Sequence, residues 1–383
     1  MRDLVARRFA HAQDSAMAAA AAEKRSYPDL IDLSIGDTDF TTDERITRAA
    51  MADALAGHTH YTDPQGDPEL IEEVRRFYDR AYRMPVDRSE VFVTASSCFG
   101  MALSLMAILN PGDEVLLFAP YFPPYREQAE LAGGVCVEVP TFEEDGFAID
   151  AARLDAAITP RTRAMIVNNP CNPTGAAYDA RVYGIISRAA RAHDLIVLAD
   201  EIYTDYMFAA PFAPLRQVPG MAERTVTLNS FSKNYIMTGW RIGYVVAPPP
   251  LVNAMRRINE NLVYTAPSIS QRAAIHALRL RDEIGDRYTA AYRERVFYCA
   301  RRINAIPGLS VRRPEGTFYL FINIRRTGLS SMDFCRKVLR EAHVAMVPGV
   351  GFGQAGEGYA RIACTTSLEN LREAFDRIER LAF

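Results

Sequence analysis

Short apolar runs alternate with amphipathic helical segments between residues 85 and 250. The runs are apolar almost throughout, as in "DEVLLFA" at 113–119 and "LIVLADE" at 195–201. Strands of this kind are buried on both faces, and sheets covered on both faces are mostly parallel. The pattern therefore predicts an α/β fold in which helices sandwich a mostly parallel sheet. We expect strands at 90–94, 113–119, 135–140, 163–169, 195–201, 225–230 and 241–247, and helices at 99–110, 124–133, 151–158 and 179–194.

After Pro250 the pattern changes to longer helices followed by a few short strands. Separate runs of helices and strands are typical of an α+β unit with its own smaller sheet. The sequence contains no internal repeat and no low-complexity linker, so we expect a helix to join the two parts. We expect helices at 251–262, 268–280 and 287–306, strands near 317–324, 344–348 and 359–365, and a final helix from about 367.

The composition and charge of the chain limit the kinds of molecule that it is expected to bind. The chain has 383 residues with 49% hydrophobic and 24% charged residues, which suits a globular protein with a large core. A net charge of -3 provides no basic surface for nucleic acid or an anionic membrane, so a small charged metabolite is favoured. The six scattered cysteines lack metal-binding spacing and fit reduced thiols in a cytoplasm.

The first 30 residues combine a basic start with an alanine run, a pattern shared with secretory signal peptides. Polar residues such as Gln13 and Asp14 interrupt this stretch, and alanine forms a weakly apolar centre. Alanine is also the strongest helix former. A helix is therefore favoured over a signal peptide, and no other stretch reaches the roughly 18 apolar residues of a membrane span.

Two acidic residues, Asp200 and Glu201, end the strand predicted at 195–201. Acids at a strand end usually cap a helix or close a turn. An ionised carboxylate beside so apolar a strand is costly unless a cation or hydrogen-bond donors meet it. Ligands of parallel sheets also bind outside the carboxyl ends of the strands. We therefore favour a role in ligand binding for Asp200.

The strand predicted at 163–169 runs into the loop "NNPCNPTG" at 168–175. Proline, asparagine and glycine are the ordinary residues of turns, so a turn alone explains this composition. The prolines at 170 and 173 would in addition hold the amide of Asn172 at a fixed angle.

The stretch "NSFSKNYIMTGWRIGY" at 229–244 places Lys233 and Arg241 among residues that favour burial. Exposed lysines and arginines are usually just solvated. In an apolar pocket, however, a lysine becomes an amine nucleophile toward carbonyl groups. The hydroxyls of Ser230 and Ser232, together with the arginine fork, suit a phosphate. The stretch therefore indicates an imine-forming lysine beside a phosphate site.

Two further patterns carry less weight. "GFGQAG" at 351–356 matches GxGxxG, but a strand-like segment follows it and not the helix that a dinucleotide site requires. His58 and His60 form an HxH pair without a third ligand nearby, so a loop is favoured over a metal site. We expect no metal.

Six motifs occur in a characteristic order: "IDLSIGDTDF", "YTDPQGDPEL", "NNPCNPTG", "ADEIY", "SFSKNYIMTGWRIGY" and "GYARIA". In these the chain resembles, over nearly its whole length, the pyridoxal-phosphate-dependent aminotransferases of class I/II, the aspartate aminotransferase superfamily of fold type I. The resemblance implies a seven-stranded sheet in the large domain and pyridoxal 5'-phosphate as cofactor. It implies transamination of an L-amino acid with a 2-oxo acid through internal aldimine, quinonoid and ketimine, in a cytoplasmic homodimer with shared active sites.

The resemblance also implies a division into domains. Residues 1–35 would form an N-terminal arm that packs with the small domain or with the partner subunit. Residues 36–262 would form the large cofactor-binding domain, and residues 263–383 the small α+β domain. The small domain would close over the substrate.

Several residue roles follow from the same resemblance. Lys233 would carry the cofactor and move the proton between Cα and C4′. Asp200 would pair with the pyridine nitrogen and so keep the ring an electron sink. Asn172 and Tyr203 would donate to the phenolic oxygen, and Phe122 would stack on the ring.

The phosphate and the substrate would be held at either end of the cofactor. Ser230 and Arg241 would bind the phosphate together with backbone groups near Ser97 and Cys98, because a helix start attracts anions. Tyr61 would reach this phosphate from the partner subunit. The substrate α-carboxylate would be bound by Gly36, Asn172 and Arg361.

One departure from the family pattern bears on the substrate. In "TASSCFGMAL", Ser96 stands at the usual glycine, and Cys98 stands where members specialised for acidic substrates often carry lysine. A neutral aromatic or aliphatic donor is therefore favoured over aspartate, with 2-oxoglutarate or pyruvate as acceptor. Two alternatives remain: a C–S β-lyase on the same fold, and a cofactor-binding regulator, which is disfavoured because the residues before Gly36 are too few and too weakly basic for a DNA-binding domain.

Overall fold

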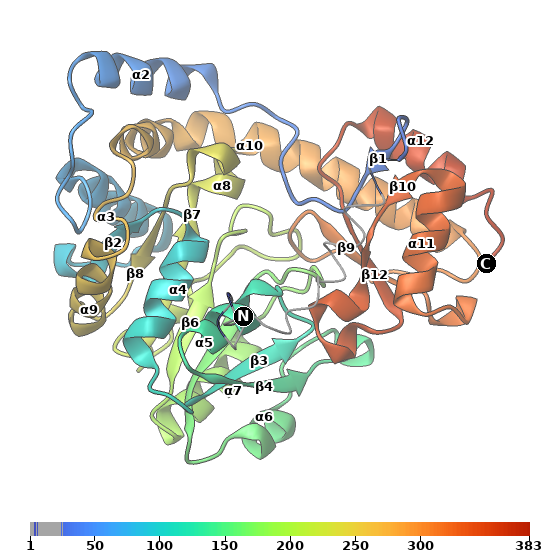
Figure 1. The fold of residues 1–383 in the computed structure, drawn as a ribbon, viewed down its shortest axis with the longest axis horizontal. Helices are drawn as coiled ribbons and strands as arrows, with labels where there is room; N and C mark the ends of the chain where they lie inside the picture. The colour runs from blue at the N-terminus through green and yellow to red at the C-terminus, as the bar shows by residue number, and fades with distance from the viewer. Residues whose placement is uncertain (1–3, 5, 7–23, 25) are drawn as a thin grey trace.

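A computed structural model describes residues 4, 6, 24 and 26–383, so most of the expected N-terminal helix lies outside the described residues. Figure 1 shows a large sheet region and a smaller region formed mainly by the C-terminal part of the chain. The long helix α10 (Ser268–Ala305) runs along both regions. Among the described residues, no helix is long and apolar enough to cross a membrane.

The large sheet has seven strands in the order β2-β8-β7-β6-β5-β3-β4. Only β8 runs antiparallel to its two neighbours. The prediction of a mostly parallel sheet is therefore confirmed. The strands are β2 (Val91–Thr94), β3 (Glu114–Ala119), β4 (Val135–Pro140), β5 (Thr162–Asn168), β6 (Ile196–Asp200), β7 (Thr225–Ser230) and β8 (Gly243–Val246).

Both faces of this sheet are covered, as the apolar runs require. Along β3, Val115 and Leu117 pack into one core while Leu116 and Phe118 pack into another, because successive side chains of a strand point to opposite faces. The first core includes α4 (Ser97–Ile108), α5 (Pro124–Leu131) and α9 (Pro249–Glu260), and the second includes α6 (Ala151–Ala157) and α7 (Ala180–Ala192).

The register of the central strands brings polar residues together at one sheet edge. Asn168 and Asp200, which end β5 and β6, are direct partners in the parallel ladder. Ser230 ends the next strand, β7. The carboxyl ends of three neighbouring strands thus form the floor of one site, as expected for an open α/β sheet.

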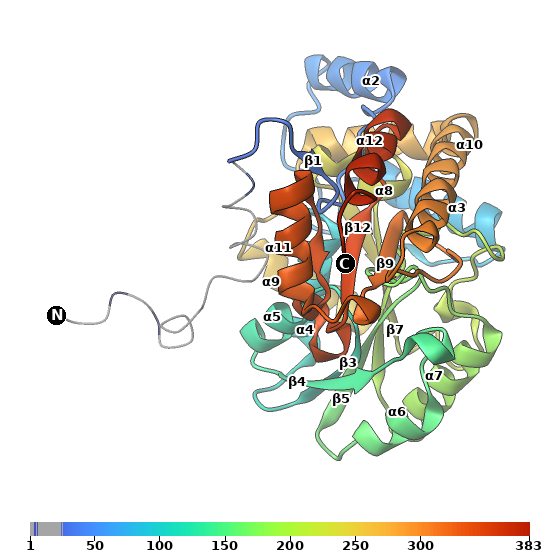
Figure 2. The same cartoon turned by 90° about the vertical axis from the view of Figure 1, so that its right-hand side faces the viewer.

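The smaller region contains a three-stranded antiparallel sheet and a two-stranded parallel one. In the latter, β1 (Ile31–Asp32) pairs with β10 (Val344–Ala345), so a segment of the expected arm is built into this region. The boundaries expected at residues 35 and 262 stay predictions. The three-stranded sheet contains β9 (Tyr319–Asn323), β11 (Val347–Pro348) and β12 (Tyr359–Ala363), and α11 (Ser331–Ala342) and α12 (Leu368–Ile378) lie beside it, as Figure 2 shows.

One expectation about the helices is wrong: the segments predicted at 268–280 and 287–306 belong to the single 38-residue helix α10. The intervening residues contain no proline, and Gly285 costs only about 1 kcal/mol relative to alanine in a helix. Arg281 fixes this part of the helix, since it forms an ion pair with Asp205 and donates to the Tyr235 hydroxyl at 2.9 Å.

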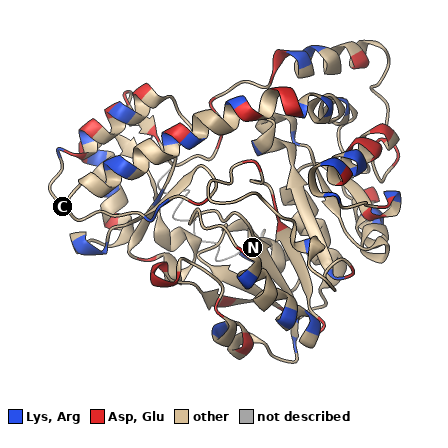
Figure 3. Cartoon of the chain, turned by 180° about the vertical axis from the view of Figure 1, so that it is seen from behind, with Lys and Arg blue, Asp and Glu red and all other residues tan. Residues whose placement is uncertain are grey.

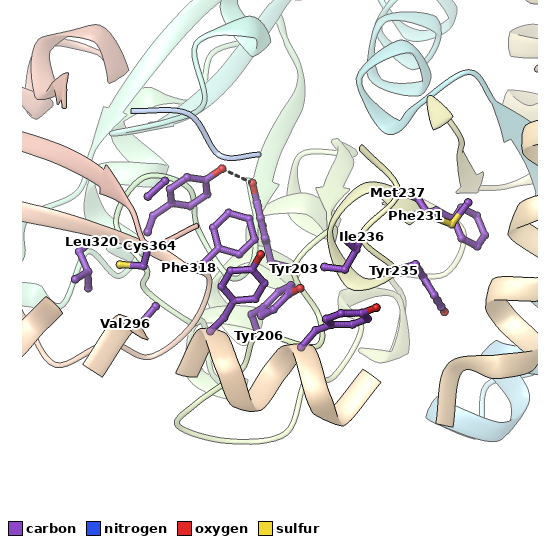
Figure 4. Close-up of a cluster of buried hydrophobic side chains, with 14 of the residues drawn as sticks. Tyr203, Tyr206, Phe231, Tyr235, Ile236, Met237, Val296, Phe318, Leu320 and Cys364 are labelled. Carbon is purple, nitrogen blue, oxygen red and sulfur yellow. Dashed lines mark hydrogen bonds between the residues drawn. The ribbon is translucent and has the colours of Figure 1, made fainter. Parts of the chain in front are cut away.

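Aromatic side chains join the two regions into a continuous core. Figure 4 shows Tyr203 and Tyr206 of the large region packed beside Phe318, whose ring centroid lies 5.4 Å and 5.3 Å from theirs. The helices α2 (Glu44–Leu55), α3 (Pro68–Tyr82) and α8 (Phe231–Asn234) complete the fold. Acidic and basic residues are interspersed along the helices seen from behind in Figure 3, in keeping with the small net charge.

Candidate active site

A cavity of about 460 Å³ lies at the carboxyl ends of β5, β6 and β7 and extends to the smaller region. This volume is typical of a small-molecule site. Of the twelve residues to which the family resemblance assigns a role, eleven line it: Gly36, Ser97, Cys98, Phe122, Asn172, Asp200, Tyr203, Ser230, Lys233, Arg241 and Arg361.

Asp200 is buried at the floor of this cavity. The Tyr125 hydroxyl donates a hydrogen bond to Asp200 Oδ2, while Oδ1 has no partner among the described residues. Burial raises the pKa of Asp200 to about 6, although the bond from Tyr125 acts in the opposite direction. A buried carboxylate with one free oxygen fits a ligand that brings a protonated nitrogen.

Lys233 sits on the short helix α8, which follows β7 directly. Ser230 caps this helix by accepting a hydrogen bond from the Ser232 amide at 3.0 Å. The Lys233 Nζ donates to the Gly36 carbonyl oxygen at 2.5 Å. A side chain at Gly36 would collide with the Tyr319 hydroxyl, 1.8 Å from the position of an added Cβ, so glycine is required for this close approach.

The start of α4 forms one wall of the cavity. Its N-cap residue Ser96 has φ 101° and ψ 156°, a conformation that normally selects glycine and costs about 1–3 kcal/mol in other residues. In partial compensation, the Ser96 hydroxyl accepts from the Phe99 amide at 3.2 Å. The amides of Ser97 and Cys98 open the helix and have no partner within it, which creates an anion site.

Further donors face the same end of the cavity. Ser230 and Ser232 are both buried, and Arg241 is exposed in the left-handed conformation with φ 52°. Arg241 Nη1 donates to the Thr238 carbonyl oxygen at 2.8 Å, which leaves the other guanidinium donors for a ligand. Hydroxyls, an arginine and a helix start together suit a phosphate.

Arg361 also lines the cavity and is 4% exposed. Its Nη1 donates to Asn172 Oδ1 at 3.1 Å and its Nη2 to the Ser34 carbonyl oxygen, while Nε has no partner in the described part of the chain. Burial lowers the pKa of Arg361, but an arginine still remains charged. A buried guanidinium with a free N–H group calls for an anion, and a carboxylate matches its geometry.

Asn172 and Tyr203 line the same cavity. The backbone N–H of Asn172 donates to the side-chain oxygen Oδ1 of Asn168 at 2.7 Å, which fixes the loop after β5. The Tyr203 hydroxyl donates to the Tyr319 hydroxyl at 3.1 Å, the dashed line in Figure 4. Burial raises the pKa of Tyr203 well above its usual value, so this phenol stays protonated and can donate.

Tyr61 is the one predicted residue that does not line this cavity. It is 80% exposed, and its ring packs edge-on against Tyr264 with centroids 5.0 Å apart. Its expected contribution to the site of a partner subunit stays a prediction.

The structure adds site residues that the motifs did not reveal. Lys24, Tyr125 and Tyr319 line the cavity, and the Tyr125 hydroxyl is hydrogen-bonded to Asp200. Tyr125 could have been suspected, since it lies three residues after Phe122, at the start of α5. The position of Lys24 had no local signal, because it depends on the pairing of β1 with β10.

The chain is similar in sequence and in structure to known aminotransferases. A family model described as aminotransferase class I and II matches residues 28–378. An aspartate aminotransferase of Pyrococcus horikoshii is 37% identical over 356 residues, covering 92% of this chain and 90% of that protein. Aromatic-amino-acid aminotransferase 2 of Thermococcus litoralis is 38% identical over 358 residues, covering 92% and 91%. The solved structure of a single mutant of Thermus thermophilus aspartate aminotransferase matches with a TM-score of 0.94 and 36% identity, covering 99% of this chain and 100% of that one.

Proposed function

The chain belongs to the class I and II aminotransferase family, and from this membership we propose that the cavity is its transamination site and that its preferred amino donor has a neutral side chain. Family membership confirms the resemblance seen in the sequence, the fold type, pyridoxal phosphate as cofactor and amino-acid transamination as the reaction. The roles of individual residues and the identity of the donor are the proposal.

The cavity residues fit the chemical groups of pyridoxal phosphate. The unpaired Asp200 Oδ1 suits the protonated ring nitrogen, and the start of α4 with Ser230 and Arg241 suits the phosphate. Lys233 supplies the amine that holds the cofactor. When bound, pyridoxal phosphate supplies a sink for the electrons left at the substrate Cα after deprotonation.

The protein residues bind the substrate and move its proton. The guanidinium of Arg361, whose Nε–H group is free, binds the α-carboxylate, which fixes Cα in the cavity. When its amine is not bonded to the cofactor, Lys233 Nζ would accept the proton from the substrate Cα and could return it to the cofactor. Asp200 would hold the proton on the ring nitrogen, and Tyr203 would donate its hydroxyl proton to the phenolic oxygen in place of the Tyr319 hydroxyl.

The environment of Cys98 supports a neutral donor. Burial raises the pKa of the Cys98 thiol, so this position carries no charge to meet a side-chain carboxylate. Gln128 Nε2 donates to both the carbonyl oxygen and Sγ of Cys98 at 3.0 Å, which holds the residue in place. A side-chain carboxylate placed against Cys98 would leave water without meeting a fixed cation at that position, which costs several kcal/mol. The relatives named above act on aspartate or on aromatic amino acids, so membership alone leaves the donor open.

A donor panel tests this proposal. We expect kcat/KM for phenylalanine, tyrosine, leucine or methionine to exceed that for aspartate with a fixed acceptor, and Cys98→Lys to shift the preference toward aspartate. A tenfold lead of aspartate in the wild-type enzyme, about 1.4 kcal/mol, would contradict it. Turnover of cysteine-like substrates without any 2-oxo acid would instead indicate β-lyase chemistry.

We also propose that the enzyme is a cytoplasmic homodimer. Exposed apolar side chains gather near Tyr61, and contiguous exposed apolar surface commonly marks an interface. The residues concerned are Leu262, Val263 and Tyr264, which are 54%, 47% and 44% exposed. The six free cysteines support a reducing compartment.

A further inference from the structure

Lys24 reaches the cavity from the N-terminal arm. Its Nζ lies 3.1 Å from Asp32 Oδ2 and also donates to the Ser34 hydroxyl. Only 15% of the Lys24 side chain is exposed, so the ammonium is held in a defined place and is not a freely solvated surface charge. Asp32 is 28% exposed and accepts in addition from the Ser34 amide at 2.8 Å.

This ion pair lies next to the proposed α-carboxylate site. The carbonyl oxygen of Ser34 accepts a hydrogen bond from Arg361 Nη2, so a single serine connects Lys24 to Arg361.

Four described basic side chains line the cavity: Lys24, Lys233, Arg241 and Arg361. The proposed function assigns the last three to the cofactor amine, the phosphate and the α-carboxylate. Lys24 alone has no role in this assignment. A positive group beside Arg361 is suited to a second carboxylate on the same substrate.

We propose that Lys24, positioned by Asp32 and Ser34, binds the distal carboxylate of a dicarboxylic 2-oxo acid acceptor of the 2-oxoglutarate type. The proposal rests on the proposed function, because it requires Arg361 to hold the α-carboxylate. A neutral donor leaves the Lys24–Asp32 pair undisturbed, since that pair already balances its own charge. A dicarboxylate shares the ammonium with Asp32. The same ammonium would meet the side-chain carboxylate of the acidic amino acid that forms from this acceptor, so the cavity would take neutral and acidic substrates in turn.

Calorimetric binding to the holoenzyme tests this with two unreactive probes, glutarate and pentanoate, which have the same chain length but two and one carboxylates. We expect the wild type to prefer glutarate. Lys24→Met should weaken glutarate binding at least tenfold and leave pentanoate binding unchanged. Asp32→Asn should strengthen glutarate binding relative to pentanoate, because it frees the ammonium. The matched control is Lys337→Met on α11, where Lys337 pairs with Glu341 at 2.9 Å, and it should change neither affinity.

The outcomes distinguish a failure of the role proposed for Lys24 from a failure of the proposed function. An unchanged ratio of glutarate to pentanoate affinity in Lys24→Met, or an equal loss for both probes, would overturn the role of Lys24 and leave it an anchor of the arm. A fall in the ratio in Asp32→Asn would likewise overturn it. If pentanoate still binds fully to Arg361→Gln, the α-carboxylate assignment and hence the proposed function are wrong.

Discussion

Replacing Asp200 with asparagine is expected to stabilise the cofactor-free protein. Burial raises the pKa of Asp200 from 3.8 to about 6 in the folded chain. At about 1.4 kcal/mol for each tenfold change in the ionisation equilibrium, the ionised carboxylate costs the folded apoprotein about 3 kcal/mol at pH 8. Asparagine carries no such cost, and its oxygen can still accept the hydrogen bond from Tyr125.

Because folding raises the pKa of Asp200, the stability gained by replacing it depends on pH. A carboxyl whose pKa is raised by folding binds its proton more tightly in the folded state, so its destabilising effect grows as the pH rises from about 4 to about 6 and is constant above that. The gain in unfolding free energy for Asp200→Asn should therefore be about 3 kcal/mol at pH 8 and about 1 kcal/mol at pH 4.5. Urea unfolding of the two apoproteins at both pH values measures it.

The same substitution should impair the loaded enzyme. A hydrogen bond to a charged group contributes about 1.5–3 kcal/mol, so cofactor affinity should fall by roughly 10- to 150-fold. Turnover should fall by roughly 10²-fold or more, since the ring nitrogen is no longer held protonated. The control is Asp194→Asn, whose carboxylate is 88% exposed and pairs with Arg224. A stability gain that is equal at both pH values, or unchanged cofactor affinity and turnover, would refute the role of Asp200.

Two other predictions address the remaining contacts. Inactive Lys233→Ala subunits mixed with inactive Tyr61→Ala subunits should regain activity through hybrid dimers with one intact site, and proven subunit exchange without regained activity would count against sharing. Tyr125→Phe removes the hydrogen bond that lowers the pKa of Asp200. As the pH is lowered, cofactor binding to the Tyr125→Phe apoprotein should therefore begin to weaken at a higher pH than binding to the wild-type apoprotein. Identical pH profiles of cofactor binding, measured by fluorescence titration, would argue against this link.

The large sheet was predictable because burial on both faces leaves a direct trace in the sequence. Runs such as 113–119 are apolar at successive positions, whereas a half-exposed strand or an amphipathic helix would have polar residues at regular intervals. The antiparallel direction of β8 left no such trace, since a strand buried on both faces has the same composition in either direction. The break expected within α10 was wrong because contacts of Arg281 with distant residues outweigh the weak helix propensity near Gly285.

The site was predictable where polar residues interrupt apolar strands. Asp200 ends β6 and Asn172 follows β5, and the parallel register of the two strands, which pairs Asn168 with Asp200, brings both to the same edge of the sheet. Lys24 could not be predicted in this way. It enters the cavity because β1 pairs with β10, more than 300 residues further along the chain, and no local pattern encodes so distant a pairing.

Reduction of the cofactor-loaded enzyme with borohydride, followed by peptide mapping, tests the central claim most directly. Borohydride fixes the cofactor to the amine that carries it, and the chain has only three lysines, at 24, 233 and 337. Two of them, Lys24 and Lys233, line the same cavity. Since Lys24 is engaged by Asp32, we predict that the label lies on Lys233 alone. A label on Lys24, or on the surface residue Lys337, would contradict the assignment of the active site.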